Sequence, residues 1–512
     1  MNAIVSRTLL CFGAIAGAGL LLTGSCRSEP KSVERTAPSA AISASKVPPT
    51  RIGINLSGLQ WYGQQRAFAN LIAVSAWRDG WQDRTPPQMD ARGTITSLGP
   101  NQFAPAMLGL PAGPFKTVRV RCTYKGKGSI RSDGFVRAAG AGKGYSDFDF
   151  VWPTKPGANG WIQIDRTDPS DPIRDFDCRE PDIPADAVYA PAFLASLKGF
   201  GVIRFLDWQE TNSGRGGKWS RFVPVDGQFR RNRAEGVRVE DMVLLANQAH
   251  SDPWFLMPYN ADDEYLRKFA QYVHDHLAPG LTAYVEFSNE AWNYIFPSTQ
   301  QALNEGVAAN LSADKHEAML RRYAQKSTEA MKVWTAIFAD DPKRIVRVVS
   351  TQNVNPHSAE VVLGFGETAK YVDALATAPY IQYSLKERTT ADLDRIFADL
   401  PAAVDEAYDF AVQNKAIAAK FGKRYIAYEG GQHLLTEDQA LALAIQRDPR
   451  MGAVYTRYLE QWQKRVGDLM VLYSHTGPIS RFGSWGLREY ADQPPEEAPK
   501  WRAVQTFIAA HR

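Results

Sequence analysis

Two glutamates end short strand-like stretches that lie far apart in the chain. Glu290 ends residues 284–290 (YVEFSNE), and Glu429 ends residues 424–429 (RYIAYE), where two glycines follow directly. Alternate side chains of a strand face opposite sides, so Glu290 would share the barrel-facing side with residues 284, 286 and 288. Glycines after a carboxylate let the backbone turn and a ligand come close. Two carboxylates at strand ends favour hydrolysis of a glycosidic bond, because one acid protonates the leaving oxygen while the other attacks or activates water.

Either glutamate alone also fits a solvated charge or a buried ion-pair partner, so the other elements must position the pair. Eight apolar stretches have the pattern of strands: residues 51–62, 201–208, 254–259, 281–290, 345–353, 372–380, 424–429 and 468–475. Helical periodicity lies between them, at residues 68–77, 191–200, 237–249, 262–276, 303–339, 391–421, 436–466 and 499–510. The pattern predicts the α/β class, as a (β/α)8 TIM barrel with the two glutamates on its fourth and seventh strands.

One long interval breaks the alternation of strands and helices. Between residues 85 and 190 apolar and polar residues alternate in short stretches, with Val118, Val120 and Cys122 on one side of a strand. This pattern favours a β-sandwich-like insertion between the first two barrel strands. The insertion either binds polysaccharide through Trp152 or Trp161 or forms one wall of the cleft. The predicted parts are a signal peptide at 1–26, a flexible tether at 27–50, the start of the barrel at 51–84, the insertion at 85–190 and the remainder of the catalytic barrel at 191–512.

An arginine is predicted inside the barrel, near one of the glutamates. Arg204 shares its parity with Val202 and Leu206 in the second predicted strand, GVIRFLDW. An inward arginine needs a carboxylate partner. That partner is either Glu429, which the positive charge would keep ionised, or Glu286 in a purely structural pair.

Taken in order, these motifs resemble the clan A glycoside hydrolases, whose barrels carry an Asn-Glu acid/base at the end of strand 4 and a nucleophilic glutamate at the end of strand 7. The resemblance covers roughly residues 51–75 and 190–512. It implies that Glu290 is the acid/base, that Glu429 is the nucleophile and that Asn289 binds the 2-hydroxyl of the sugar. It also implies an arginine near the nucleophile, a tyrosine bonded to it and a tryptophan under the reacting sugar, which match Arg204, Tyr380 and Trp485.

Two further aromatic residues are predicted to contact sugar: Trp292 beside the acid and Tyr259 at the end of the third strand. The resemblance implies a retaining glycosidase that cleaves a β-linked poly- or oligosaccharide, with endo-action favoured over exo-action. A transglycosylase is a variant of that mechanism. Two other functions stay open, namely a non-catalytic carbohydrate-binding envelope lipoprotein on the same barrel and a structural lipoprotein without a ligand.

Composition and short motifs bear on the other classes of function. The 512 residues carry a formal charge of only +4, with 44% hydrophobic and 22% charged residues, so we expect a globular protein that does not bind nucleic acid. No metal is predicted at His274-Asp275-His276, because residues two apart on a helix do not share a face. No cofactor is predicted either, since the glycines at 364 and 366 lack the strand, helix and acidic partner of a dinucleotide site.

The N-terminus has the pattern of an export signal, with Arg7, an apolar segment at 9–22 and then Cys26. It resembles a bacterial lipoprotein signal in which Cys26 is lipidated, which implies an outer-membrane lipoprotein or a periplasmic protein in the cell envelope. Thr23 stands where such signals usually have leucine, so simple cleavage after Ser25 stays open. In an oxidising envelope Cys122 and Cys178 either pair as a disulfide or stay as buried thiols.

Overall fold

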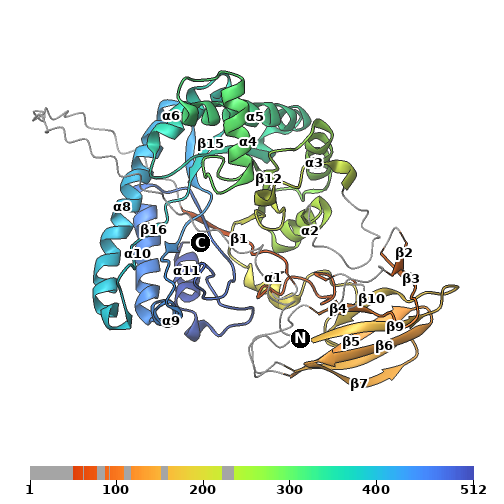
Figure 1. The fold of residues 1–512 in the computed structure, drawn as a ribbon. Coiled ribbons are helices and arrows are strands. Elements are labelled where there is room, and N and C mark those ends of the chain that lie inside the picture. The colour runs from red at the N-terminus through yellow and green to blue at the C-terminus, as the bar shows by residue number, and fades with distance from the viewer. Residues whose placement is uncertain are drawn as a thin grey trace, which may run out of the picture.

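Eight parallel strands close into a barrel in the computed structural model, which describes residues 50–511 apart from 61–62, 76, 78–86, 91–92, 109–116, 152–159 and 222–235 (Figure 1). In barrel order they are β1 (Arg51–Asn55), β11 (Val202–Arg204), β12 (Asp252–Met257), β13 (Ala283–Phe287), β14 (Ile345–Ser350), β15 (Ala374–Thr377), β17 (Arg424–Ala427) and β19 (Leu469–Leu472). The predicted (β/α)8 barrel is therefore confirmed. Glu290 and Glu429 follow its fourth and seventh strands.

Helices follow the strands and pack around the barrel (Figure 1). The main ones are α1 (Pro191–Ser196), α2 (Val239–Ala249), α3 (Asp263–His276), α4 (Pro297–Ala308), α5 (Lys315–Ile337), α6 (Pro356–Gly364), α8 (Leu393–Lys420), α9 (Gln439–Arg447), α10 (Pro449–Arg465) and α11 (Pro499–Ala510). Aspartate side chains cap several of them, as Asp262 does by accepting from the backbone N–H of Tyr265. The single helical region predicted at 436–466 is divided where Asp448 caps α10 and Pro449 begins it.

The alternation of side chains along the strands separates two hydrophobic clusters. Tyr284 faces the barrel interior, where it packs with other inward residues such as Trp254. Val285 and Phe287 face outward and join the large cluster between the strands and the helices. The inward and outward sides predicted for residues 284–287 are thus confirmed. Because most of the interior is apolar, the polar side chains at its C-terminal end stand out.

The insertion forms a separate lobe beside the barrel, orange to yellow in Figure 1. Two antiparallel sheets enclose a core of their own, and β2 (Gln88–Met89) and β3 (Ile95–Ser97) pair as a further, two-stranded sheet. One sheet has the order β10 (Arg174–Arg179), β5 (Thr117–Lys125), β8 (Tyr145–Val151) and β7 (Val136–Gly142), and the other β4 (Ala104–Met107), β9 (Gly160–Thr167) and β6 (Gly128–Gly134). Cys122 and Cys178 lie opposite each other on β5 and β10 and form a disulfide. This decides between the two expectations for the cysteines in favour of pairing.

The helix predicted at residues 68–77 is wrong. The backbone N–H groups of Ala69 and Leu71 donate to the carbonyls of Val188 and Cys178, so they serve long-range contacts rather than a helix. Leu71, with Ile72 and Trp77, packs into the core of the insertion. The apolar spacing of this stretch therefore serves the sandwich, whose core begins before residue 85.

The export signal, the tether and Cys26 lie outside the described residues. Within the described ranges, none of the helices combines the length and the apolar character needed to span a bilayer.

Candidate active site

The acid candidate lies directly beyond the fourth strand, on a strained turn. β13 ends at Phe287, and Ser288 and Glu290 then take left-handed backbone conformations with φ of 61° and 41°. Non-glycine residues pay about 1–3 kcal/mol for such conformations, which cluster at functional sites. The turn carries Asn289 and Glu290 to the C-terminal end of the barrel. The side chain of Glu290 is 8% exposed, so it is largely desolvated but still reachable.

The nucleophile candidate is held by a close approach of backbone to side chains. β17 ends at Ala427, and Glu429 is followed by Gly430 and Gly431. A Cβ atom at Gly430 would lie 2.4 Å from the hydroxyl of Tyr458, and Gly431 has φ of 126°. Only glycine fits both positions without displacing this packing. The two glycines thus let the chain bend just after Glu429, so that its carboxylate turns into the barrel mouth.

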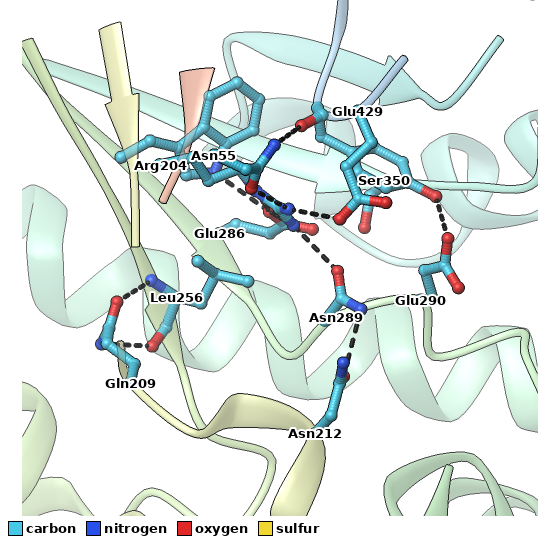
Figure 2. Close-up of polar contacts among 12 residues, drawn as sticks. Asn55, Arg204, Gln209, Asn212, Leu256, Glu286, Asn289, Glu290, Ser350 and Glu429 are labelled. Carbon is cyan, nitrogen blue, oxygen red and sulfur yellow. Dashed lines mark hydrogen bonds and ion pairs between the residues drawn. The ribbon is translucent and has the colours of Figure 1, made fainter. Parts of the chain in front are cut away.

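Arg204 is the hub of the site (Figure 2). It is fully buried at the end of β11, and all of its N–H donors are used. One amino group donates to Glu429 at 2.8 Å and to Asn55 at 3.1 Å, and the other to Asn289 at 2.8 Å. Glu286 accepts from the second amino group at 2.9 Å and from Nε at 3.2 Å. The two partners expected as alternatives, Glu429 and Glu286, are therefore bound at once.

The two catalytic candidates have different partners. Tyr380 donates its hydroxyl to Glu429 at 2.9 Å, which is the contact that the resemblance implied. Tyr428 donates to one oxygen of Glu290 at 2.9 Å, and Asn293 donates to the other at 2.9 Å. Glu429 therefore contacts a positive charge and a hydroxyl, whereas Glu290 contacts only neutral donors.

These surroundings shift the pKa values of the two acids. Burial raises the pKa of Glu290, while the hydrogen bonds from Asn293 and Tyr428 act in the opposite direction. Burial also raises the pKa of Glu429, to about 8, with Arg204 opposing the shift and the charge of Glu290 adding to it. Because Glu429 alone contacts the guanidinium, its ionised form is the better stabilised, so the pair loses its first proton from Glu429. The singly protonated pair therefore carries its proton on Glu290 and has a carboxylate at Glu429.

Two more predicted residues lie at the same end of the barrel. The side-chain oxygen of Asn289 is bound by Arg204, and its amide group donates to Asn212 at 3.1 Å (Figure 2). Trp485 follows β19, lies edge-on to Tyr473 with 6.0 Å between the ring centroids, and packs against the interior cluster. Both are fixed by neighbouring side chains before any ligand arrives.

Tyr259 and Trp292 are not brought to the two carboxylates by any contact of the described residues. Tyr259 is buried in the outer cluster, where its ring packs on Phe287 and its hydroxyl donates to Glu305 at 3.0 Å. Trp292 is half-buried against the same cluster. In the insertion, Trp161 donates to the neighbouring Gln163 at 3.0 Å, and Trp152 lies outside the described residues.

Several residues of the site were not predicted as functional. Asn55 closes β1 and donates to the carbonyls of Tyr428 and Leu472, so it joins three barrel strands while it binds Arg204. The sequence feature that could have pointed to Asn55 is a polar residue at the end of a mostly apolar first strand. Asn293 and Tyr428 each lie within three residues of a catalytic candidate in the sequence. Nothing in the sequence alone assigned their hydrogen bonds to Glu290 rather than to solvent.

Two acidic residues with shifted pKa values lie on the loop that leaves β11, and one of them, Asp207, interacts with Arg204. Tyr473 donates to Asp207 at 3.1 Å, and burial raises the pKa of Asp207 to about 6. Burial and the charge of Asp207 raise the pKa of Glu210 to about 7. Across the described residues, no set of three or more His, Cys, Asp and Glu side chains has an arrangement suited to a metal ion. Among the described residues, three carboxyl groups thus lie near the fully bonded Arg204, namely those of Glu286, Glu429 and Asp207.

Comparisons with known proteins give distant structural likenesses. No protein-family model and no curated protein sequence matches the chain. An α-L-arabinofuranosidase from Thermotoga maritima is 14% identical, with a TM-score of 0.37 over 62% of this chain and 63% of that one. A 4-O-α-L-rhamnosyl-β-D-glucuronidase from Fusarium oxysporum is 13% identical, with a TM-score of 0.39 over 61% and 62%. A family 1 β-glucosidase from Thermotoga maritima is 11% identical, with a TM-score of 0.34 over 62% and 85%.

This chain therefore spans less than two thirds of the length of the arabinofuranosidase and of the glucuronidase. The barrel assignment rests on the closed order of the eight parallel strands.

Proposed function

We propose that this protein is a retaining glycoside hydrolase that cleaves β-linked poly- or oligosaccharides, with endo-action. The observation that carries the proposal is the pair of buried carboxyl groups at one end of the barrel, of which only Glu429 contacts Arg204. Retaining hydrolysis needs two carboxyl groups with different proton affinities, and their separate partners supply that difference. A structural ion pair needs no second acid, no left-handed turn at Glu290 and no access to solvent.

In the first step Glu290 gives its proton to the glycosidic oxygen as that bond breaks, and Glu429 forms a bond to the anomeric carbon. In the second step Glu290 takes a proton from water, whose oxygen attacks the same carbon and releases Glu429 as a carboxylate. Arg204 and Tyr380 stabilise the negative charge of Glu429 before attack and after release. Asn289, held by Arg204, is positioned to bind the 2-hydroxyl, where contacts strengthen in the transition state.

Labelling with activity-based epoxide probes built on several β-sugars tests this proposal. We expect a covalent adduct on Glu429, found by intact-protein mass spectrometry and peptide mapping, and none on Glu429→Gln. The same probe set identifies the sugar class. Glu290→Gln and Glu429→Gln should each abolish turnover of a matching glycan while the proteins stay folded. A glycan that binds tightly and emerges uncut from the wild-type protein would support the carbohydrate-binding alternative instead.

We further propose that the protein is exported and anchored in the cell envelope through a lipid on Cys26. The support is the sequence pattern before Cys26 and the Ser-, Ala-, Pro- and Lys-rich segment at 27–50, which has the composition of a tether. Detergent phase partition of the cell envelope tests this. The wild-type protein should enter the detergent phase and Cys26→Ser the aqueous phase. An aqueous wild-type protein that begins at Cys26 would indicate simple signal cleavage.

A further inference from the structure

A large groove lies beside the candidate active site, and none of the residues discussed for catalysis explains it. It measures about 780 Å³ and is lined by residues 382–388, Glu406, His433 and residues 435–438. We refer to it as the side groove. Its two long walls begin at the short strands β16 (Ile381–Gln382) and β18 (Gln432–His433), which pair in parallel beyond the ends of β15 and β17. The groove is therefore built on the strands that carry Tyr380 and Glu429.

His433 connects the side groove to the catalytic residues. Its ring lies 5.6 Å from that of Tyr380 and 5.7 Å from that of Trp485, centroid to centroid, and it also lines the groove. Trp485 donates its indole N–H to Nδ1 of His433 at 3.3 Å. Because an indole only donates, Nδ1 must accept, and the proton of the neutral ring sits on Nε2. Burial lowers the pKa of His433, which keeps the ring neutral. His433 thus contacts Trp485, the tryptophan expected under the reacting sugar, and its ring keeps an N–H donor at Nε2.

The walls of the groove carry charges of both signs. Lys386, Glu387 and Arg388 follow β16 on the first wall, and the lining also includes Glu406, Glu437 and Asp438. The Nε atom of Arg388 is buried and has no hydrogen-bond partner among the described residues. Leu385 and Leu435 add apolar surface. Mixed donors and acceptors over apolar patches suit a neutral ligand rich in hydroxyl groups, because each hydroxyl both donates and accepts.

An exposed aromatic ring lies beyond the second wall. Glu437 approaches Arg481 at 3.9 Å, and the guanidinium of Arg481 lies 4.7 Å from the centre of the Phe482 ring. Phe482 is 48% exposed, which is high for a phenylalanine. It belongs to the same loop as Trp485. Aromatic surface therefore occurs near the groove residue Glu437, through Arg481, as well as at Trp485 beside His433.

We propose that the side groove is an accessory binding site for a neutral oligosaccharide. It would hold the sugar units next to the unit whose glycosidic bond is cleaved by Glu290 and Glu429. This inference rests on the proposed hydrolase function and deepens it, because it assigns the substrate to neutral chains of several units. His433 positions the chain where it passes from the catalytic site into the groove. A volume of about 780 Å³ is well above what a single sugar ring needs and lies within the range of small-molecule sites.

The dependence of rate on chain length tests the proposal. The substrates are an aryl β-monoglycoside and cello-, manno-, xylo- and galacto-oligosaccharides of two to six units. For the matching series, kcat/KM should rise roughly tenfold or more from the shortest chain to the longest, as expected for a few added hydrogen bonds to charged groups. Ser384→Trp places a bulky ring in the groove and should remove most of this gain. Ala308→Trp, at the exposed end of α4, is the matched control and should leave every rate unchanged.

A second variant and a binding measurement distinguish failure of the accessory site from failure of the proposed hydrolase function. Glu406→Ala removes an exposed acceptor from the groove without filling it and should reduce the gain a few-fold. Titration calorimetry of the longest oligosaccharide with Glu429→Gln, with and without Ser384→Trp, should show weaker binding when the groove is filled. Rates that do not depend on chain length, or equal losses on short and long substrates, would overturn the accessory site. A wild-type protein that cleaves nothing but loses oligosaccharide affinity with Ser384→Trp would overturn the hydrolase and keep the groove.

Discussion

Pairs of arginine and carboxylate occur in both the barrel and the insertion, in opposite surroundings. Arg204 and its partners are 0–7% exposed, and the guanidinium joins four strands of the barrel. In the insertion, Arg119 with Asp149 and Arg121 with Asp147 pair across β5 and β8, and both arginines are about half exposed. Buried pairs lose much solvation, whereas exposed pairs gain and lose little. Arginine–carboxylate pairs therefore form part of the candidate active site in the barrel, whereas in the insertion they lie on the protein surface.

The difference shows in which region this molecule keeps charged groups buried although their desolvation lowers stability. The barrel interior holds two ionisable acids with raised pKa values and a desolvated arginine, and buried charges of this kind can often be replaced by apolar residues of similar volume without loss of stability. The insertion instead keeps its core apolar around the disulfide and its charges outside. A region selected only for stability has the second pattern. Four predictions test this contrast, beginning with the largest expected effect.

Replacing Arg204 should damage both activity and folding. Arg204→Met leaves Glu286 and Glu429 buried without a counterion, which typically costs about 3–5 kcal/mol of stability. Attack by Glu429 should also fail, since its ionised form loses its main support. Denaturant unfolding and kcat/KM on the matching aryl glycoside measure the two effects. Arg204→Lys should rescue little, because one ammonium cannot reproduce the five bonds of the guanidinium. Near-normal activity in either variant would remove Arg204 from the site.

Breaking the disulfide should affect the insertion alone. Cys122 and Cys178 are 56 residues apart, and closing a loop of that length restricts the unfolded chain by about 4 kcal/mol in the entropy model. The double variant Cys122→Ser, Cys178→Ser should therefore lower the unfolding free energy of the insertion by about that amount and leave kcat/KM unchanged. Hydrogen exchange resolved by region measures the first effect. A matching loss of protection in the barrel strands would show that the two regions fold as one unit.

The contact between Tyr380 and Glu429 should appear in the pH profile. Glu429 must be ionised to attack, so kcat/KM falls as the pH drops through its pKa, which burial has raised well above that of an ordinary glutamate. The Tyr380 hydroxyl stabilises the ionised form, and its removal in Tyr380→Phe raises the pKa of Glu429 further. The acid limb should then move to higher pH by up to about one unit. The alkaline limb reports loss of the Glu290 proton and should stay in place.

Two controls separate this shift from general damage. Tyr383→Phe, in the side groove and bonded to Asp399, should leave the acid limb unchanged. A fall in rate for Tyr380→Phe without any movement of the acid limb would show that Tyr380 binds sugar rather than tuning Glu429.

The sequence predicted the parts of this structure that repeat. Eight strands with intervening helices follow from periodicity, and inward parity correctly placed Arg204 and Glu286. Parity failed beyond the strand ends. Glu429 shares the parity of the outward Ala427, yet it reaches Arg204 because the strand ends at Ala427 and the chain bends at residues 428 and 429. Such bends depend on tertiary packing, which local patterns do not record.

Predictions for single residues succeeded where a specific contact was expected and failed where only the position in the sequence was used. The expected hydrogen bond from Tyr380 to Glu429, the proposed nucleophile, is present. Tyr259 was predicted only from its position after a strand, and it packs outward with its hydroxyl on Glu305 instead. The helix predicted at 68–77 failed because its apolar residues meet the insertion, a partner that is distant in the sequence. Periodicity reports that a face is buried and does not report what buries it.

The smallest effect is expected where the comparison began, on the surface of the insertion. Arg121 lies across from Asp147, and its guanidinium also lies 4.5 Å from the centre of the Tyr145 ring. Arg121→Ala removes an exposed cross-strand pair and a surface ring contact, so only a small loss of stability is expected. Thermal unfolding at low and high salt measures it, and the loss should shrink as salt screens the pair. A loss as large as that of Arg204→Met would mean that this face of the sheet is buried against something else, and the contrast between the two regions would then fail.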